Sequence, residues 1–305
     1  MRNVLTLSRH ANTGEEMITE ESGTLVGPMR RPVNSSANLG AGSIHDDATA
    51  QNLGFRGGTV AGSIHMDQFP PLLVQTFGPA WFETGSLSLH FRNATTDGEP
   101  VQASVERPAD TTDSQTAVRM LREDGLLVAE GTASVGRPGT PSHLSSIDLR
   151  PTDPSELVLL RDVKAGDALE EYEEAVDGAG LRARIDSGRL TEPLDWYTGD
   201  SPWGGPIAYP SAIVGLLWRR ASRSFSRGMG GAVGLFGAIE VRHVDGPLFA
   251  DRPYQVSGEV VAVGSSPKTE YVWFDSHAAE DGRRVASMRM QLRWMKASSP
   301  KYQQA

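Results

Sequence analysis

Two long apolar segments share a sequence context that predicts two similar helices. One follows the double glycine Gly57-Gly58 and reads TVAGSIHMDQFPPLLVQTF, and the other follows Gly204-Gly205 and reads PIAYPSAIVGLLWRR. Neither segment alternates apolar and polar residues, which favours a buried or half-buried helix over a strand. Both contain proline, so we expect these helices to be kinked or to begin late.

Each predicted helix is followed by four segments with the pattern of β-strands. Their residues alternate between apolar and polar types or are rich in β-branched types, and Gly, Pro and Asp turns separate them. The first set comprises residues 86–93, 101–108, 116–124 and 126–136, and the second comprises 237–244, 254–264, 269–277 and 284–294. The double glycines lie 147 residues apart, and the turns at 97–100 and 250–253 lie 153 residues apart. The chain therefore contains an internal repeat.

The repeated unit predicts an α+β fold in which one helix packs on an antiparallel meander, with an additional strand ahead of the helix. Residues 136–156, between the copies, are rich in Pro, Gly and Ser, as linkers are. We therefore expect an N-terminal domain over 1–145 and a C-terminal domain over 146–305. The acidic run at 170–174 is typical of a solvated face or a strand edge.

Composition and charge narrow the classes of function. The chain has 305 residues and a formal net charge of −9, which disfavours nucleic acid and anionic lipid as partners. The absence of cysteine excludes disulfides, thiolate metal sites and cysteine nucleophiles. No apolar run approaches the roughly 18 residues of a membrane span, and the first residues do not read as a signal peptide. We expect a cytoplasmic protein, and no motif indicates a metal or a redox cofactor.

The segment SIHDDATAQNLGFRGGTVAG, at 43–62, carries the most informative motif. Together with the duplicated helix and sheet, it resembles the MaoC-like (R)-specific enoyl-CoA hydratases and dehydratases in their double-hotdog form. The signature of that family runs Gly-Asp-x-Asn-Pro-aliphatic-His-x-Asp, then Gly-Phe-x-Gly, then a His-Gly pair at the start of the central helix. The resemblance covers both halves in pattern and about residues 38–100 in motif. It implies two hotdog units, each a central helix wrapped by an antiparallel sheet.

Carried over residue by residue, the resemblance implies roles for three residues. His45 matches the histidine that handles a proton near the reacting carbons. Asp47 matches the aspartate that braces the local turn, and 54–57 matches Gly-Phe-x-Gly. Gly62 matches the glycine whose backbone N–H would polarise a thioester carbonyl, although close packing of helix on sheet would also require glycine.

Four positions depart from the family pattern. The catalytic aspartate would lie at Gly40, the asparagine at Gly42 and the proline at Ser43. The histidine before the helix glycine is replaced by Ala61, which we place with Gly62 among the candidate substrate contacts. The usual Asp–His dyad is therefore absent from this chain.

Three other residues are candidates for the second acid or base. Asp46 adjoins His45 and could raise its pKa or replace the missing carboxylate. His65 belongs to GSIHMD, an echo of GSIHDD 20 residues earlier, and could face the same cavity as Gly62. Asp200 lies four residues before Gly204 in the second copy. Local capping or burial in the core are the alternatives for these side chains.

The second copy differs from the first where the chemistry is expected. Its segment PWGGPIAYPS has no histidine and places Tyr209 where the first copy has Gly62, which implies a scaffold and cavity wall. Trp196 and Tyr197 precede it, and with Tyr209 they could line a substrate pocket or fill the core.

These observations predict a lyase that adds or removes water at a C=C bond conjugated to a carbonyl. The substrate would be a CoA or carrier-protein thioester, or a small carbonyl compound without a thioester. A hotdog thioesterase and a non-catalytic binding protein or subunit remain alternatives, because the dyad is missing. We expect a small-molecule partner and no cofactor, and both a monomer and a homodimer are open.

Overall fold

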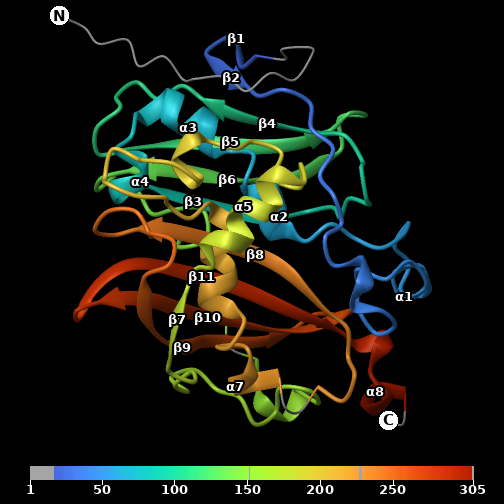
Figure 1. Ribbon diagram of the computed structural model, residues 1–305. Coiled ribbons are helices and arrows are strands. Elements are labelled where there is room, and N and C mark those ends of the chain that lie inside the picture. Colours follow the sequence, from blue (N-terminus) through green and yellow to red (C-terminus); the bar gives the residue numbers. More distant parts are fainter. Residues whose placement is uncertain (1–16, 151, 227–228, 304–305) are drawn as a thin grey trace, which may run out of the picture.

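The computed structural model describes residues 17–150, 152–226 and 229–303, and a single antiparallel sheet runs through all of it (Figure 1). The strands of the first half are β1 (Thr19–Glu21), β2 (Thr24–Val26), β3 (Ser86–Phe91), β4 (Val101–Glu106), β5 (Ser114–Arg122) and β6 (Leu127–Val135). Those of the second half are β7 (Tyr172–Ala175), β8 (Gly234–His243), β9 (Pro253–Ser265), β10 (Thr269–Glu280) and β11 (Arg283–Met295). The predicted strands are thus confirmed in both halves. We predicted that the first residues do not form a signal peptide, and these residues lie outside the described part of the chain.

The helices are short and lie mainly on one face of this sheet (Figure 1). In the first half they are η1 (Ala37–Leu39), α1 (Asp47–Asn52), α2 (Gly62–Met66), α3 (Pro70–Phe77) and α4 (Trp81–Thr84). In the second half they are η2 (Pro154–Glu156), α5 (Gly178–Asp186), η3 (Asp195–Tyr197), α6 (Pro210–Trp218), α7 (Arg223–Ser226), η4 (Lys296–Ser298) and α8 (Pro300–Gln303). Among the described residues, no helix is long and apolar enough to cross a membrane.

Proline determines where the two central helices begin and break. The first predicted helix is divided into α2 and α3, and Pro70 and Pro71 open α3, since a proline ring cannot continue the preceding helix. The second begins at Pro210, at a first-turn position where the missing N–H has no consequence. The predicted kink and the predicted late start are both confirmed.

The order of the strands explains how the halves join. In each half the last three long strands form a meander, but the first long strand pairs with the last, β3 with β6 and β8 with β11. This arrangement leaves β3 and β8 free to pair with each other, from Ser86 opposite Arg242 to His90 opposite Ala238. Because the pairing is antiparallel, the two halves are related by an approximate two-fold rotation, and α2 packs against α6.

Further contacts between the halves surround this central pair. Trp203 Nε1 donates to Glu83 Oε1 at 2.9 Å, and Arg30 pairs with Glu192. The chain between β6 and β7, where we predicted the domain boundary, crosses the second half and buries Leu144 against Trp273. The largest core cluster contains residues of both halves, and the cluster around Leu144 is separate from it.

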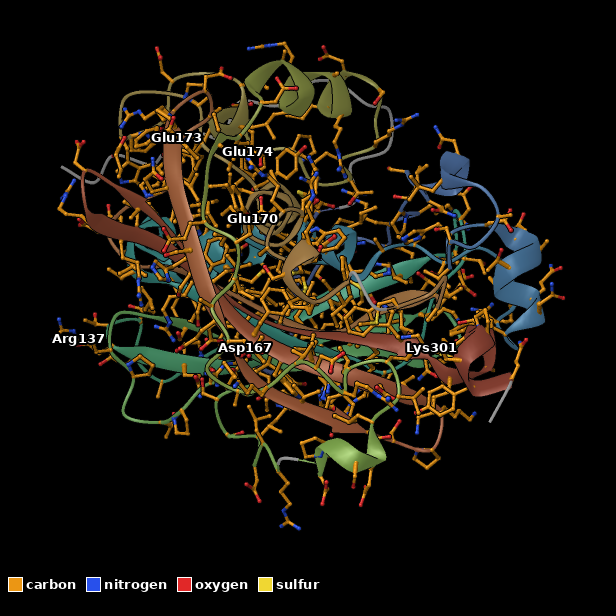
Figure 2. All side chains as sticks on the ribbon, turned by 90° about the horizontal axis from the view of Figure 1, so that it is seen from below. Arg137, Asp167, Glu170, Glu173, Glu174 and Lys301 are labelled. Atoms are coloured by element: carbon orange, nitrogen blue, oxygen red, sulfur yellow. The ribbon has the colours of Figure 1, made fainter. Side chains whose placement is uncertain are left out.

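The acidic run at 170–174 lies at the far edge of the sheet. β7 is the last strand in the order, with its outer edge unpaired among the described residues. Glu173 is exposed, and Figure 2 shows it near Glu174 on this strand, with Glu170 on the segment that precedes the strand. Charged side chains on an edge strand discourage pairing with another chain.

The close approach of β6 to β3 yields a test of the fold. A Cβ atom added to Gly131 would lie 1.8 Å from the backbone oxygen of Ser88, and neither strand can move without breaking its ladder. We expect Gly131→Ala to lower the free energy of unfolding by about 1–3 kcal/mol, as overpacking does. Gly139→Ala is the matched control, since nothing lies within 4 Å of that added Cβ. Equal urea midpoints for the two variants would contradict this register of β3 and β6.

Candidate functional site

A cavity of about 1200 Å³ lies between the two halves. Its wall includes the end of β3 at Phe91, the start of β8 at Gly234 and the turn between β9 and β10 at Lys268. The 43–65 segment, which carries the MaoC-like motif, forms another side, and one face of α6 completes it. Both halves therefore build one site.

The cavity wall is cationic although the chain is acidic overall. Five cationic side chains line it: Arg92, Arg184, Arg219, Lys268 and Arg293. None of the described residues that line it is an aspartate or a glutamate. Such a wall favours an anionic ligand. The described residues contain no cluster of three His, Asp or Glu placed to hold a metal ion.

His45 lies on the cavity wall with a defined ring orientation. Its Nδ1 lies 2.6 Å from the carbonyl oxygen of Thr59. A carbonyl only accepts hydrogen bonds, so Nδ1 carries the proton and Nε2 of the neutral ring has a free lone pair. The side chain is half-buried. The backbone therefore sets the tautomer of the neutral ring and leaves Nε2 able to accept a hydrogen bond.

The loop around His45 is fixed by its neighbours. Asn34 Nδ2 donates to the carbonyl of His45 at 2.8 Å, and Asp47 Oδ1 accepts from Gly58 N at 2.7 Å. Asp47 thus braces the turn, as the resemblance implied. Asp46 instead caps α1, accepting from Thr49 Oγ1 at 2.7 Å and from Thr49 N at 2.9 Å, and these bonds lower the pKa of its carboxyl. Asp46 is not among the residues that line the cavity.

His65 lies on the same wall as His45 but is fully enclosed. Its Nε2 lies 2.8 Å from Thr95 Oγ1, and its Nδ1 is buried with no hydrogen-bond partner among the described residues. Burial lowers the pKa of His65 to about 4, so its ring is neutral at physiological pH. It can offer a hydrogen bond to a ligand, but it is a weak base.

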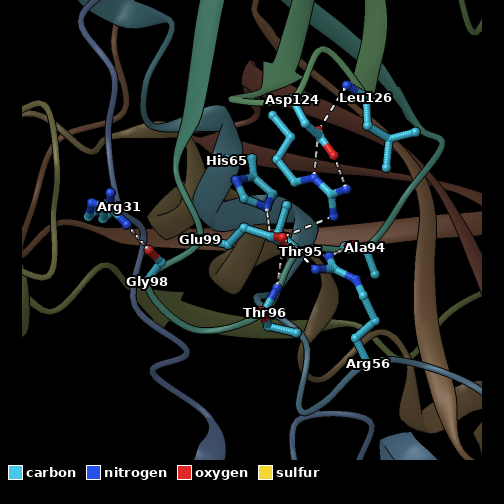
Figure 3. Close-up of polar contacts among 11 residues, drawn as sticks. Arg31, Arg56, His65, Ala94, Thr95, Thr96, Gly98, Glu99, Asp124 and Leu126 are labelled. Atoms are coloured by element: carbon cyan, nitrogen blue, oxygen red, sulfur yellow. Dashed lines mark hydrogen bonds and ion pairs between the residues drawn. The ribbon is translucent and has the colours of Figure 1, made fainter.

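A charged network holds the loop that carries Thr95 (Figure 3). Glu99 accepts from both terminal nitrogens of Arg56 at 2.5 and 2.6 Å and from Arg122 at 2.9 Å. These hydrogen bonds, chiefly that of Arg56, lower the pKa of Glu99 and keep it ionised. The same carboxylate accepts from Thr96 N at 3.1 Å, which fixes the residue next to Thr95.

Gly62 and Ala61 lie on the cavity wall where α2 begins. The backbone N–H groups of Gly62 and Ser63 have no hydrogen-bond acceptor among the described residues. A Cβ at Gly62 would lie 2.7 Å from the ring of Phe91, so only glycine permits this approach of strand and helix. Close packing and a free N–H are both present at this position.

Asp67, at the end of α2, bonds to the other half of the molecule. Its carboxylate accepts from Ser211 N at 2.7 Å and from Ser211 Oγ at 2.6 Å, and so caps α6. Burial raises the pKa of Asp67 to about 7, although both bonds to Ser211 and the charge of Arg184 oppose the rise. Ser211 itself lines the cavity.

Backbone hydrogen bonds reveal which residues correspond between the halves. Thr59 N bonds to the carbonyl of Ile44, and Ile207 N bonds to that of Trp196 in the same way. The next residues, Val60 and Ala208, also make equivalent bonds. Each of these pairs, Thr59–Ile207 and Val60–Ala208, is separated by 148 positions rather than 147, because Pro206 adds one residue after the second double glycine.

This correspondence corrects the predicted alignment by one residue. Tyr209 corresponds to Ala61, and Pro210, not Tyr209, corresponds to Gly62. By the same bonds Tyr197 corresponds to His45. Proline has no backbone N–H. The second half therefore has neither the histidine nor the N–H donor of the first.

The candidates from the second half lie away from the cavity wall. Trp196, Tyr197 and Tyr209 are buried in an aromatic cluster, where the rings of Tyr197 and Tyr209 lie 5.4 Å apart. Asp200 is exposed. None of the four is among the cavity-lining residues, so their catalytic or binding roles stay predictions.

Sequence reasoning missed the contributions of Ser211, Asp67 and Arg184. Asp67 caps a helix whose first turn lies 144 residues away in the chain, and no local pattern indicates such a contact. Arg184 lies on α5, which has no motif. The repeat of GSIHDD as GSIHMD at 62–67 was the one sequence signal near Asp67.

Comparisons of sequence and structure give different answers. No family model matches the sequence, and no curated protein matches it. A solved structure from Chloroflexus aurantiacus, described as a MaoC domain protein dehydratase, aligns with a TM-score of 0.60 at 14% identity, over 94% of this chain and 99% of that one. A conserved hypothetical protein from Mycobacterium tuberculosis with a double hotdog fold aligns with a TM-score of 0.55 at 14% identity, over 90% and 97% of the two chains. The chain has the double hotdog fold of MaoC-like dehydratases, and the predicted fold class is confirmed.

Asp67 makes the stability of the protein depend on pH. Its pKa is near 3.8 in the unfolded chain and about 7 in the folded one. Between these values the folded state holds the proton more tightly than the unfolded chain does. Asp67 therefore contributes its full stabilisation below the unfolded pKa, and this stabilisation is lost as pH rises through about 7. Asn in its place can accept from Ser211 N through Oδ1 and donate from Nδ2 to Ser211 Oγ, without the charge. We expect the unfolding free energy of Asp67→Asn, relative to wild type, to increase from about pH 5 to about pH 8. Asp200→Asn is the control, and a constant difference for Asp67→Asn would refute a raised pKa.

Proposed function

We propose that the protein is a hydratase or dehydratase that acts on an α,β-unsaturated acyl-CoA. The observation that carries the proposal is the placement of His45, with its Nε2 lone pair free, on the same cavity wall as the unpaired N–H groups at the start of α2. One group moves a proton and the other stabilises negative charge, which are the two requirements of this reaction.

In hydration, His45 Nε2 takes a proton from water while the water oxygen forms a bond to Cβ of the substrate. The electron pair of the C=C bond moves to Cα and the thioester oxygen, giving an enolate. The N–H of Gly62 donates to that oxygen. The imidazolium then returns its proton to Cα, so the water is added in full and His45 recovers its neutral form. Dehydration is the reverse sequence.

The approximate two-fold symmetry of the halves supports the position proposed for the enolate oxygen, at the start of α2. Ser63 corresponds to Ser211 and Asp67 corresponds to Gly215. In the second half the N-terminus of the helix is occupied by the carboxylate of Asp67. By the same two-fold symmetry, Gly215 lies at the N-terminus of α2 in the first half. Gly215 has no side chain, and it lines the cavity. The N–H groups of α2 thus face open space where those of α6 face an anion.

The cationic wall supports a CoA thioester over a small neutral compound. Arg92, Arg219 and Lys268 are exposed at the cavity opening, and the phosphates of CoA are anions that such residues bind. A cavity of about 1200 Å³ is larger than a small carbonyl compound requires.

One of the three candidates for the second acid or base lies on the cavity wall. Of Asp46, His65 and Asp200, only His65 lines the cavity. Because its ring is neutral, we assign it a hydrogen bond to water or substrate, and we assign the proton transfers to His45 alone. A thioesterase would need a carboxylate to activate water, and no described residue of the wall supplies one.

Turnover of enoyl-CoA substrates tests this function. Purified protein is mixed with enoyl-CoA thioesters of several chain lengths, and the loss of enoyl-thioester absorbance is followed. We expect hydration that falls by about 100-fold or more in His45→Ala, since general acid–base catalysis contributes on that scale. His277→Ala is the control, because that ring bonds to Ser257 and does not line the cavity. A folded wild type without turnover on any chain length would contradict the hydratase and favour a binding role.

A second experiment tests the CoA part of the substrate. Lys268→Gln removes one cation at the cavity opening, and we expect KM for an enoyl-CoA to rise about two- to fivefold with kcat unchanged, as for an exposed charge contact. An enoyl-pantetheine thioester, which lacks the CoA phosphates, should show no such change. Arg137→Gln is the control, because Arg137 is exposed near the opposite end of β3 (Figure 2). Equal changes in KM for both thioesters would overturn the assignment.

A further inference from the structure

Arg184 is a cation without a hydrogen-bonded counterion among the residues that the structure describes. Its Nε and one terminal nitrogen are buried and have no hydrogen-bond partner among the described residues. The side chain lines the cavity, and its guanidinium lies 5.7 Å from the centroid of the Tyr209 ring. A guanidinium donates up to five hydrogen bonds in a fixed plane, and leaving buried donors unused is unfavourable. The geometry calls for a planar anion with two acceptor oxygens.

Asp67 is an acid whose charge interacts with that of Arg184, and it is already bonded elsewhere. One of its oxygens accepts from Ser211 N and the other from Ser211 Oγ. Arg184 acts on Asp67 through its charge, without a hydrogen bond between them. The Tyr209 ring beside the guanidinium is neutral, because burial raises the pKa of its hydroxyl. No described carboxylate forms a hydrogen bond with Arg184, and its side chain lines the cavity, so its charge favours an anionic ligand there.

The face of α6 gives the order of groups along the cavity. Arg219, Gly215 and Ser211 lie on one face of this helix at intervals of four residues, and all three line the cavity. Arg219 is exposed at the opening, Gly215 is placed opposite the start of α2, and Ser211 lies beside Asp67 and the charge of Arg184. At 1.5 Å per residue, Ser211 lies about 6 Å further inside than Gly215.

We propose that Arg184 binds a carboxylate at the far end of the acyl group, so that the substrate is the CoA thioester of a short dicarboxylic enoic acid. This rests on the proposed function, which places the thioester carbonyl at the start of α2 and the CoA at the opening. A distance of about one helical turn beyond that carbonyl suits an acyl chain of about four to six carbons. A long alkyl chain would instead bring methylene groups against buried, charged nitrogens.

Binding of two unreactive ligands tests the proposal without turnover. Glutaryl-CoA and pentanoyl-CoA have acyl chains of equal length and differ by a terminal carboxylate in place of a methyl group. We expect calorimetry on the full chain to give at least tenfold tighter binding of glutaryl-CoA, and a ratio near one in Arg184→Met. Arg182→Met is the control, since Arg182 lies on the same helix, is exposed and is outside the cavity wall.

Three results would overturn the proposal. The first is equal binding of the two ligands by wild type, and the second is binding of neither. The third is equal weakening of both ligands by Arg184→Met, which would place a CoA phosphate at Arg184. Folding is checked by the Tm of Arg184→Met, which should not fall because the variant removes a buried charge without a hydrogen-bonded partner.

Turnover of glutaconyl-CoA and 2-pentenoyl-CoA separates this proposal from the proposed function. Hydration of both without a preference for glutaconyl-CoA would leave the hydratase standing and reject the role of Arg184. Hydration of neither, with the binding preference intact and dependent on Arg184, would reject the hydratase and keep the carboxylate site.

Discussion

The antiparallel pairing of β3 with β8 is the constraint on which the rest of the structure depends. It joins the six described strands of the first half and the five of the second into one sheet, and it fixes the approximate two-fold axis between the halves. Once this register is set, α2 and α6 must lie side by side, and the end of β3 must meet the start of β8. The cavity forms at that meeting point, so neither half has a complete site by itself.

The buried polar groups around the two helices are kept in different states by their surroundings. Asp67 has two hydrogen bonds from α6, whereas Arg184 has unused donors in the cavity wall. His65 is held neutral by burial, and His45 is held by a carbonyl that dictates its tautomer. Asp67 is thus bonded through both oxygens where the two halves meet, whereas His45 and Arg184 line the cavity.

Much of the fold could be predicted from local sequence patterns, because strand alternation, proline positions and turn residues act over short distances. The late start of α6 at Pro210 and the strands of both halves follow from such signals. The pairing of β3 with β6 and β8 could not be predicted, since it depends on contacts between distant segments. The motif located His45 and Gly62 on the wall, but Arg184 has no local signal, and the extra Pro206 shifted the alignment of Tyr209 by one residue.

The differences between the halves follow from single atoms at equivalent positions. Gly62 has a backbone N–H and Pro210 has none, so only the first half can donate from the first residue of its helix. Gly215 leaves open the place that Asp67 fills on the other side of the two-fold. A carboxylate at the start of α6 occupies the position that an oxyanion would take at the start of α2. The stabilising interaction in one half thus indicates, through the symmetry of the fold, the kind of charge that the other half is built to receive.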